Sequence, residues 1–561
     1  MNSIMYCEIT PHSETVDRWN DVTINAGASQ STLQDIKLPE GAGCFTYRSS
    51  GDLSSCCSNR FIYWRTNHDV IELVEISLDF TLRGNHLRLR FQNTPILRGV
   101  SIHENHDQVV LLVATVSAIH KLVFPHPRRL ERDCGFPVKK KEVAGPSVFF
   151  DTTGATLRSR SCYFVLNHVS LGIPLPHTSC SWLDVEGNAT FVLANSAGSV
   201  LMVVMSDKHG VEITTTELMK TGSIFRLFNG LVPAVMRNNR TEVALSIVCH
   251  QDVNNVLVFS LFSDLQIRIW SHRRQECLLV DSVLNFDSEK NLIAGNFTAH
   301  QCHLRKSLSG SNHNFYLGIY IPVPHQKMFY VFQPLTSPDK CKLKLKSTLR
   351  QTQHDLVDFC ISNTHIWTLW LSFENQPIVF SADIESALKT EPDIYWVPVD
   401  LQPQVCRTID YGASTPQEAY LKEIFKVGRF LPSTISKAIS IYQTAKNSSF
   451  ISNVSMKVDD LRSRVIEAVE SEILIKTGNL DDAENEYCEI AAECWDRFFS
   501  YCIQYHEVGM KPLGMSVDPC TGCVILIKKN FYSLLCPCDS LELMTSPNFR
   551  SFFFVSLLDE E

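Results

Sequence analysis

The sequence lacks an apolar run that could cross a bilayer. The best candidate, residues 109–119, has about half of the roughly 20 residues that a membrane-spanning helix needs. It ends at His120 and Lys121, and we expect a pair of buried strands there. Residues 1–10 also lack the basic and apolar regions of a signal peptide. We therefore expect neither a transmembrane segment nor secretion.

Positive charge is in short supply. The chain has 51 Lys and Arg against 60 Asp and Glu, a formal net charge of −9. General electrostatic binding of nucleic acid needs a surplus of basic residues, so no direct contact with nucleic acid is expected. Cysteine, in contrast, is plentiful at 20 residues. In a long chain without a secretion signal, these are best interpreted as reduced thiols in the cytosol or nucleus.

Catalytic motifs are missing as well. The sequence has no phosphate loop of the G-x-x-x-x-G-K-S/T kind, no H-E-x-x-H and no G-x-S-x-G. Single Ser, His and Asp residues abound, but their spacing alone cannot assemble a triad. We therefore expect no enzyme, no catalytic residues, no cofactor and no small-molecule substrate.

Short strands dominate residues 60–399. Runs of about four to six β-branched or aromatic residues alternate with turns rich in Gly, Asn, Asp, Pro and Ser, for example around Asp184–Asn188. Tight turns between successive runs indicate antiparallel meanders. They predict one β-propeller or several sandwiches. No clean repeat of about 40–45 residues emerges. About 55 residues per blade would give about seven blades.

The pattern becomes helical near Tyr411. Thr415, Pro416 and Glu418 form a capping box with proline at the first helical position. Apolar residues at helical spacing predict helices from there, from about Ser433, over 458–475 and over 480–505. A hairpin of strands follows at 514–527, and an isolated hairpin needs a sheet to join.

The simplest fold is mainly β with an α insertion: a propeller interrupted by a small helical bundle before its last blade. We expect an N-terminal arm and first strands in 1–58 and most propeller blades in 59–410. The helical insertion then covers 411–510, the strands that complete the propeller 511–540, and a C-terminal tail 541–561.

Several segments resemble one family of nucleoporins. Phe61–Thr66, Asp69–Glu75, Leu87–Phe91, Gly99–Ile102 and His120–Pro127 are similar to the opening of the 160-kilodalton class of the nuclear pore's Y-shaped complex. Later pieces follow in a similar order, which are Tyr316–Tyr320, Ile366–Trp367, Glu418–Leu421 and Lys528–Lys529.

The resemblance implies a seven-bladed propeller with a helical insertion, followed by a helical solenoid. It also implies a scaffold role in the outer ring of the nuclear pore at the nuclear envelope. Pore assembly, mRNA export and protein transport would follow, with other Y-complex nucleoporins as partners of the propeller and helical surfaces. The chain stops soon after the last expected strands, so we expect fewer partners than the family has.

Two groups of cysteine and histidine residues are candidate metal sites. Cys520 and Cys523 lie in a hairpin turn near Cys536 and Cys538, but zinc needs four suitably placed ligands. Thiols in and near a strand turn are the favoured interpretation. His300, Cys302 and His303 match no common spacing, so a surface loop is expected there. We therefore expect no metal site.

Two basic clusters and two aromatic groups are candidate binding surfaces. His120 and His126 with Arg128 and Arg129 could bind phosphate, but a strand end and a proline-fixed loop are favoured. Residues 139–141 are three lysines, which could form a localisation signal or contact phosphate, but a solvated loop is favoured. We expect burial between blades or within the helical core for Trp182, Trp270, Trp367, Trp370, Trp495, Phe498 and Tyr501.

Two other functions remain open on the sequence alone. A soluble WD-type adaptor, for instance in a ubiquitin ligase, would have a regular blade motif and a polar pocket in the central channel. A propeller enzyme would need carboxylates or histidines that converge on that channel. The weak repeat counts against the adaptor.

Overall fold

The computed structural model describes residues 6–537 apart from short gaps. The gaps are 10–14, 17–18, 26–32, 48–59, 78–81, 83–84, 134–146, 153–154, 158, 167–173, 207–211, 220–241, 253–254, 287–296, 308–313, 324–325, 338–339, 352–353, 374–375, 386–395, 402–408, 410–414, 427–428, 445–455, 478–483 and 519–522. The expected tail at 541–561 lies outside the described residues.

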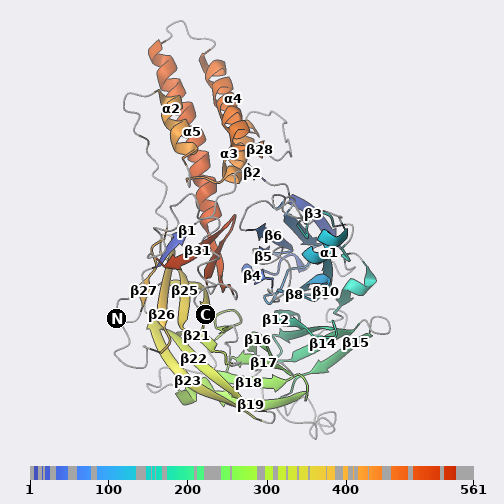
Figure 1. Cartoon of the computed structure of the whole chain (residues 1–561). Helices are drawn as coiled ribbons and strands as arrows, with labels where there is room; N and C mark the ends of the chain where they lie inside the picture. Colours follow the sequence, from blue (N-terminus) through green and yellow to red (C-terminus); the bar gives the residue numbers. More distant parts are fainter. Residues whose placement is uncertain are drawn as a thin grey trace.

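Seven sheets of four or five strands surround one axis (Figure 1). Blade 1 contains β3 (Trp19–Ile24), β4 (Gly41–Thr46), β5 (Arg60–Asn67), β6 (Val70–Ser77) and β7 (His86–Phe91). Blade 2 contains β8 (Ser101–Glu104), β9 (Gln108–Ala114), β10 (Ala118–Pro125) and β11 (Tyr163–Val165). Blade 3 contains β12 (Pro176–Leu183), β13 (Ala189–Asn195), β14 (Val200–Ser206) and β15 (Glu212–Glu217).

The ring continues in the same way. Blade 4 contains β16 (Ala244–Asp252), β17 (Asn255–Phe262), β18 (Gln266–Ser271) and β19 (Glu276–Ser282). Blade 5 contains β20 (His303–Lys306), β21 (Leu317–Val323), β22 (Gln326–Thr336) and β23 (Cys341–Gln351). Blade 6 contains β24 (Asp355–Ile361), β25 (His365–Leu371), β26 (Pro377–Asp383) and β27 (Val397–Pro398). Blade 7 contains β29 (Pro512–Val517), β30 (Val524–Lys528), β31 (Tyr532–Pro537) and β1 (Tyr6–Ile9).

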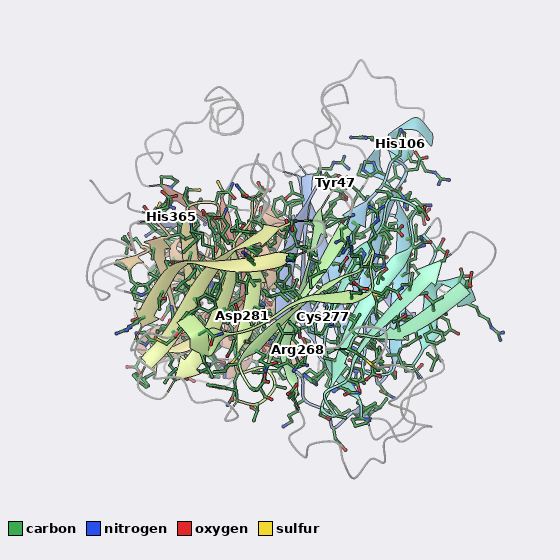
Figure 2. All side chains as sticks on the ribbon, turned by 90° about the horizontal axis from the view of Figure 1, so that it is seen from below. Tyr47, His106, Arg268, Cys277, Asp281 and His365 are labelled. Atoms are coloured by element: carbon green, nitrogen blue, oxygen red, sulfur yellow. The ribbon has the colours of Figure 1, made fainter. Side chains whose placement is uncertain are left out.

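Each blade is a meander whose first strand lies at the axis. Neighbouring inner strands contact one another around the ring, from β4 and β8 to β29, which contacts β4 in turn. Turns between the first and second strands therefore share one face of the ring. Figure 2 shows this for His106 in blade 2 and His365 in blade 6, which lie along the same rim. The predicted seven-bladed, mainly β fold is confirmed.

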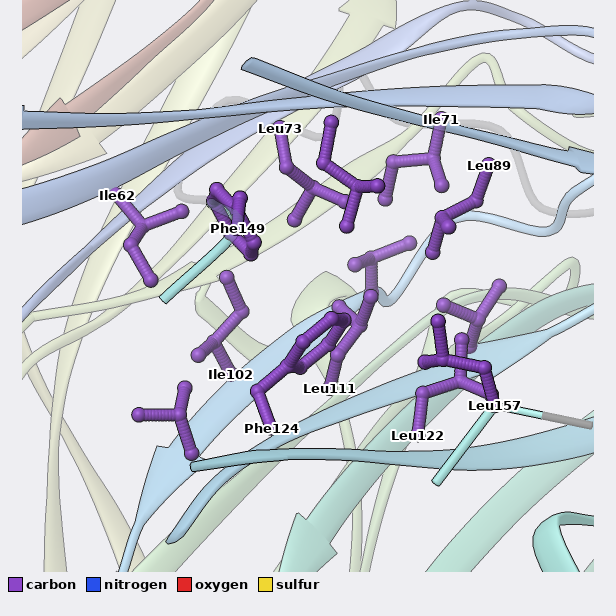
Figure 3. Packing of buried hydrophobic residues seen from close by; sticks show 14 of the residues in the cluster. Ile62, Ile71, Leu73, Leu89, Ile102, Leu111, Leu122, Phe124, Phe149 and Leu157 are labelled. Atoms are coloured by element: carbon purple, nitrogen blue, oxygen red, sulfur yellow. The ribbon is translucent and has the colours of Figure 1, made fainter. Parts of the chain in front are cut away.

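The hydrophobic core lies between adjacent blades. A middle strand such as β13 is buried along its whole length, because each sheet is covered on both faces by its neighbours. This explains why Phe191, Val192, Leu193 and Ala194 of β13 form an uninterrupted apolar run instead of alternating with polar residues. Ile62, Leu73 and Leu89 of blade 1 pack against Leu111 and Phe124 of blade 2 in one such layer (Figure 3).

The ring is closed by the N-terminal strand. β1 pairs antiparallel with β31, and Cys7 lies opposite Cys536. Its other edge bridges to blade 6, because the Glu8 amide donates to the Asp400 carbonyl at 2.8 Å. The N-terminal segment 1–58 thus contributes strands to the last blade and to the first. β1 joins blade 7, and β3 joins blade 1, where it pairs in parallel with β7.

Four helices extend from the rim of the ring (Figure 1). They are α2 (Pro416–Ile424), α3 (Pro432–Thr444), α4 (Val458–Thr477) and α5 (Glu484–Met510), and they confirm the four predicted helices. We call α2–α5 the helical arm. At its base, β2 (Thr15–Val16) pairs with β28 (Met456–Lys457), so the N-terminal segment also contacts the arm.

Candidate functional site: the propeller axis and the helical arm

Inner strands approach one another closely at the axis. Gly99 has a φ of +105°, and a Cβ there would lie 2.0 Å from the Ser179 carbonyl oxygen. Only glycine tolerates that backbone and that contact. The Ser179 hydroxyl donates to the Arg98 carbonyl at 2.6 Å, and the hydroxyls of Ser101 and Ser181 lie 2.8 Å apart. Blades 2 and 3 are therefore joined directly by backbone and hydroxyl groups.

Side chains also reach across the axis. Arg98, between blades 1 and 2, lies 3.0 Å from His303 Nδ1 on the inner strand of blade 5. Burial and the guanidinium groups of Arg98 and Arg305 hold the pKa of His303 well below its ordinary value. The imidazole is therefore neutral at pH 7 and can accept the hydrogen bond from Arg98.

One buried carboxylate joins three blades. Asp358 of β24 accepts two hydrogen bonds from Arg305 of β20, at 3.0 and 2.6 Å. Its second oxygen accepts from the backbone amide of Met515 on β29 at 3.2 Å. Asp358 is only 6% exposed, so these contacts replace the water that the charge loses. Blades 5, 6 and 7 are thus held together at one point.

The axis therefore contains two arginines, a carboxylate and a histidine, each engaged by a neighbour. Burial, with the charge of nearby Arg305, lowers the pKa of Arg98 to about 10, so it remains charged at neutral pH. A carboxylate and a histidine do converge here, as a propeller enzyme would require. Each is used to connect blades, and the arrangement acts as a structural tie.

The arm is attached rigidly to blade 7. α5 ends at Met510 and β29 begins at Pro512, so one residue separates the helix from the innermost strand of the blade. Lys511 pairs with Glu40 at 2.8 Å, and its carbonyl accepts from the Lys529 amide at 2.9 Å. A helix joined this directly to a ring strand has little freedom to swing.

A second tie closes the ring beside that junction. Glu8 of β1 pairs with Lys528 of β30 and accepts from Ser533 of β31, and both charged side chains are almost completely buried. Burial lowers the pKa of Lys528, while the Glu8 carboxylate opposes that shift. Lys528 also lies 3.7 Å from the sulfur of Met510 at the end of α5. The closing strand and the arm therefore meet at Lys528.

The arm has its own core. α5 packs against α2, α3 and α4, and its Trp495 and Phe498 are buried there. Tyr501 packs against the same cluster, so the predicted helical core is confirmed. Thr415 caps α2 by accepting from the Glu418 amide at 3.3 Å, as the capping box predicts.

The arm ends in exposed apolar residues. Leu474 and Ile475 at the end of α4 are 69% and 71% exposed, and Tyr487 near the start of α5 is 47% exposed. These positions lie at the end of the α4–α5 pair that is farthest from the ring (Figure 1).

The cysteine cluster is only partly described. Cys520 and Cys538 lie outside the described residues. Cys523 and Cys536 form no disulfide and hydrogen-bond to one another beside the β30–β31 pair. That bond and burial raise the pKa of Cys536 far above its ordinary value. Among the described residues, no group of three or more His, Cys, Asp or Glu could hold a metal ion.

The expectation of a surface loop at His300–His303 is correct for His300 and Gln301, which lie in a turn, but wrong for Cys302 and His303. Cys302 is fully buried in the core between blades 4 and 5, and His303 begins the inner strand β20. Alternation explains the error: Cys302 and Leu304 face the core, so His303 faces the axis.

The two histidines of the basic cluster near β10 are buried within the chain. His120 is buried against Phe91, and His126 is buried beside Glu104 at 3.2 Å. β10 ends at Pro125 as predicted, but the short helix α1 (Pro127–Asp133) replaces the expected loop and carries Arg128 and Arg129. The lysines at 139–141 lie outside the described residues.

The predicted burial of tryptophans between blades is confirmed. Trp182 and Trp270 share one core cluster between blades 3 and 4. Trp370 packs between blades 5 and 6, and Trp367 contacts Tyr6 of the closing strand with ring centroids 4.7 Å apart.

Sequence reasoning missed Glu8, Arg98 and Asp358. Only Lys528 gave a usable signal, because it follows four apolar residues in a strand that is buried throughout. A charged residue in such a strand requires a buried partner.

A closed ring of seven blades that carries a helical arm defines the class of protein, which is the β-propellers. The sequence matches the family described as nucleoporin Nup120/160, β-propeller domain, over residues 60–542. The chain belongs to this family.

Curated relatives agree with this assignment. Nuclear pore complex protein Nup160 of Mus musculus is 32% identical over 91% of this chain, and that of Homo sapiens is 31% identical over 91%. The Drosophila melanogaster homolog is 30% identical over 96%. The chain spans 36%, 35% and 37% of these relatives' lengths, respectively.

Solved structures add little. The propeller domain of Myceliophteria thermophila Cps50 (Swd1) aligns at 11% identity with a TM-score of 0.34, over 64% of this chain and 88% of that one. A TM-score that low carries no argument. Among the described helices, none is long and apolar enough to cross a membrane.

Proposed function

We propose that the chain is a structural scaffold component of the nuclear pore complex at the nuclear envelope. Its partners are other nucleoporins of the Y-shaped complex, which contact the propeller and helical surfaces. Through that scaffold the chain supports pore assembly, mRNA export and nucleocytoplasmic protein transport. One observation carries the proposal: membership of the Nup120/160 family across residues 60–542.

The geometry supports a frame in preference to a catalyst. The charged groups at the axis, Arg98, Arg305 and Asp358, form hydrogen bonds with residues of other blades. A non-enzymatic role follows from that use and from the family. The soluble adaptor is not favoured, because the chain's curated relatives are named as nuclear pore complex proteins.

The test is localisation combined with assembly. The chain is expressed with a fluorescent tag at its endogenous level, and the expected result is a rim at the nuclear envelope. Affinity purification with quantitative mass spectrometry is expected to recover nucleoporins in stable stoichiometry. Diffuse staining without nucleoporin recovery would overturn the proposal.

A matched variant sharpens the test. Trp495→Ala removes the centre of the arm core and costs about 3–5 kcal/mol, while the ring cores remain. If the arm contributes to assembly, this variant loses part of the nucleoporin set while retaining the fold of the ring. The surface variant Lys437→Glu on α3 is the control, because Lys437 is exposed and lies outside the core.

A further inference from the structure

The outer edge of blade 5 differs from the other outer edges of the ring. β23 is 11 residues long, whereas the outermost strands β11, β15, β19 and β27 have 3, 6, 7 and 2 residues. Among the described strands, none pairs with its free side. An outermost strand presents unpaired backbone amides and carbonyls, so β23 is a long template for an added strand.

This edge carries lysines at alternate positions. Lys342 and Lys344 are exposed, as is Lys340 just before the strand, while Leu343 and Leu345 pack toward the core of blades 4 and 5. Successive side chains of a strand point to opposite faces. The lysines therefore share the solvent face of the sheet.

The same face continues onto β22. Leu335 lies opposite Lys342, and Gln333 lies opposite Lys344, and residues directly opposite one another share a face. Leu335 is 45% exposed. We call Lys340, Lys342, Lys344, Gln333 and Leu335 the blade 5 edge.

The lysines of this edge form no ion pair with the carboxylates that the structure describes. Among the described residues, no carboxylate lies within 4 Å of Lys340, Lys342 or Lys344, although most cations near the axis and the arm junction are paired. This is a local basic surface on a chain whose net charge is −9.

We propose that the blade 5 edge binds an extended acidic protein segment, which adds a strand to β23. Main-chain hydrogen bonds would supply affinity, and carboxylates at every second residue would face Lys342 and Lys344. The alternate residues would be apolar, because they would extend the face formed by Leu343 and Leu345.

The occupant follows from charge and geometry. Carboxylates two residues apart on a strand repeat at the same spacing as the lysines. Single-stranded nucleic acid binds on exposed aromatic side chains, and none of the exposed large hydrophobic residues on this edge is aromatic. A membrane surface would require more apolar contact than Leu335 alone provides.

The test uses the full chain and a fluorescent peptide of about eight residues with alternating glutamate and valine. Binding is measured by fluorescence anisotropy, and amide exchange across residues 341–351 by mass spectrometry. We expect saturable binding that weakens with salt, and slower exchange in β23 when the peptide is bound.

Two variants with equal changes in charge distinguish a binding site on the blade 5 edge from a general effect of the net charge of the chain. K342E/K344E alters the edge, and K422E/K437E alters two exposed lysines on the arm. The edge variant is expected to bind the peptide about tenfold more weakly or worse, and the arm variant to bind like the wild type. K342Q/K344Q, which removes charge without reversing it, is expected to fall between them. Equal melting temperatures confirm that the variants are folded.

Several outcomes would overturn the proposal. They are equal binding by the edge and arm variants, protection of amides outside β23, or preferential binding of single-stranded RNA or anionic vesicles that the peptide does not displace. Self-association of the wild type that K342E/K344E abolishes would assign the edge to a second copy of the chain. No peptide binding by the folded wild type would leave the lysines as protection against edge pairing.

Discussion

The ring and the arm are built on contacts of different range. In the arm, Thr415 caps its own helix three residues away, and Tyr420 bonds Asp496 within the same four helices. In the ring, the decisive contacts join Glu8 to Lys528 and Arg98 to His303. The arm is therefore organised by contacts within its own four helices, while the ring depends on residue pairs that are hundreds of positions apart in the sequence.

Breaking the closing tie should give the largest difference between the two regions. Glu8→Ala leaves the buried Lys528 charge without its partner, at a cost of about 3–5 kcal/mol. Hydrogen exchange should show blade 7 opening first, while α2–α4 keep their protection. Replacing the pair by apolar residues, Glu8→Leu with Lys528→Met, should recover much of the loss. Equal loss of protection in α2–α4 would contradict the difference in range.

Acid should destabilise the ring more than the arm, but by less than the loss of the Glu8–Lys528 pair does. Burial lowers the pKa of His120 to about 3, so the folded ring favours the neutral imidazole. The unfolded chain binds that proton near pH 6.5, so stability is complete above 6.5 and falls as the pH drops below it. For His120 alone the loss is about 2 kcal/mol at pH 5.

His120→Phe should therefore flatten the stability of the ring between pH 6.5 and pH 5, measured by urea unfolding at each pH. His106→Phe is the control, because His106 is an exposed residue of the same blade. The arm has a single histidine, His506. Burial and the charge of Lys528 lower the pKa of His506 to about 4. The acid sensitivity of the arm should therefore be concentrated at the base of the arm, where His506 lies. An unchanged pH slope in His120→Phe would show that other groups control acid unfolding.

The smallest effect should come from the local cap. Thr415→Ala removes the oxygen that accepts from the Glu418 amide and should cost about 1 kcal/mol. Exchange should rise in the first turn of α2 and leave the ring unchanged. Thr415→Ser, which keeps the hydroxyl, should behave like the wild type. A change in blade 7 would mean that the arm and the ring are more tightly coupled than their contacts indicate.

The sequence was sufficient where chemistry is local. The capping box at Thr415 and the apolar spacing around Trp495 predicted the helices because a helix is specified by neighbours three or four residues apart. Strand runs and turns such as Asp184–Asn188 predicted meanders for the same reason. The number of blades could be predicted only from an average blade length, because loops of irregular length hide the repeat.

The long-range contacts that close and connect the ring could not be predicted from the sequence. Tyr6–Ile9 is a short run in a polar segment, and nothing near it reveals that its partner is Tyr532–Pro537. His303 was misplaced because its surroundings suggest a polar loop, while its burial depends on Arg98 about 200 residues earlier. Such residues become interpretable only when the fold brings their partners together.

The position of β1 has a consequence for synthesis. Cys7 and Cys536, paired across the closing sheet, are separated by 529 residues. At about 5–20 residues per second, the ribosome needs roughly 30 to 100 s to make the second after the first. During that interval the nascent N-terminus has no strand to join, and its apolar side chains must be shielded by other means. The ring therefore cannot close before blade 7 has been synthesised.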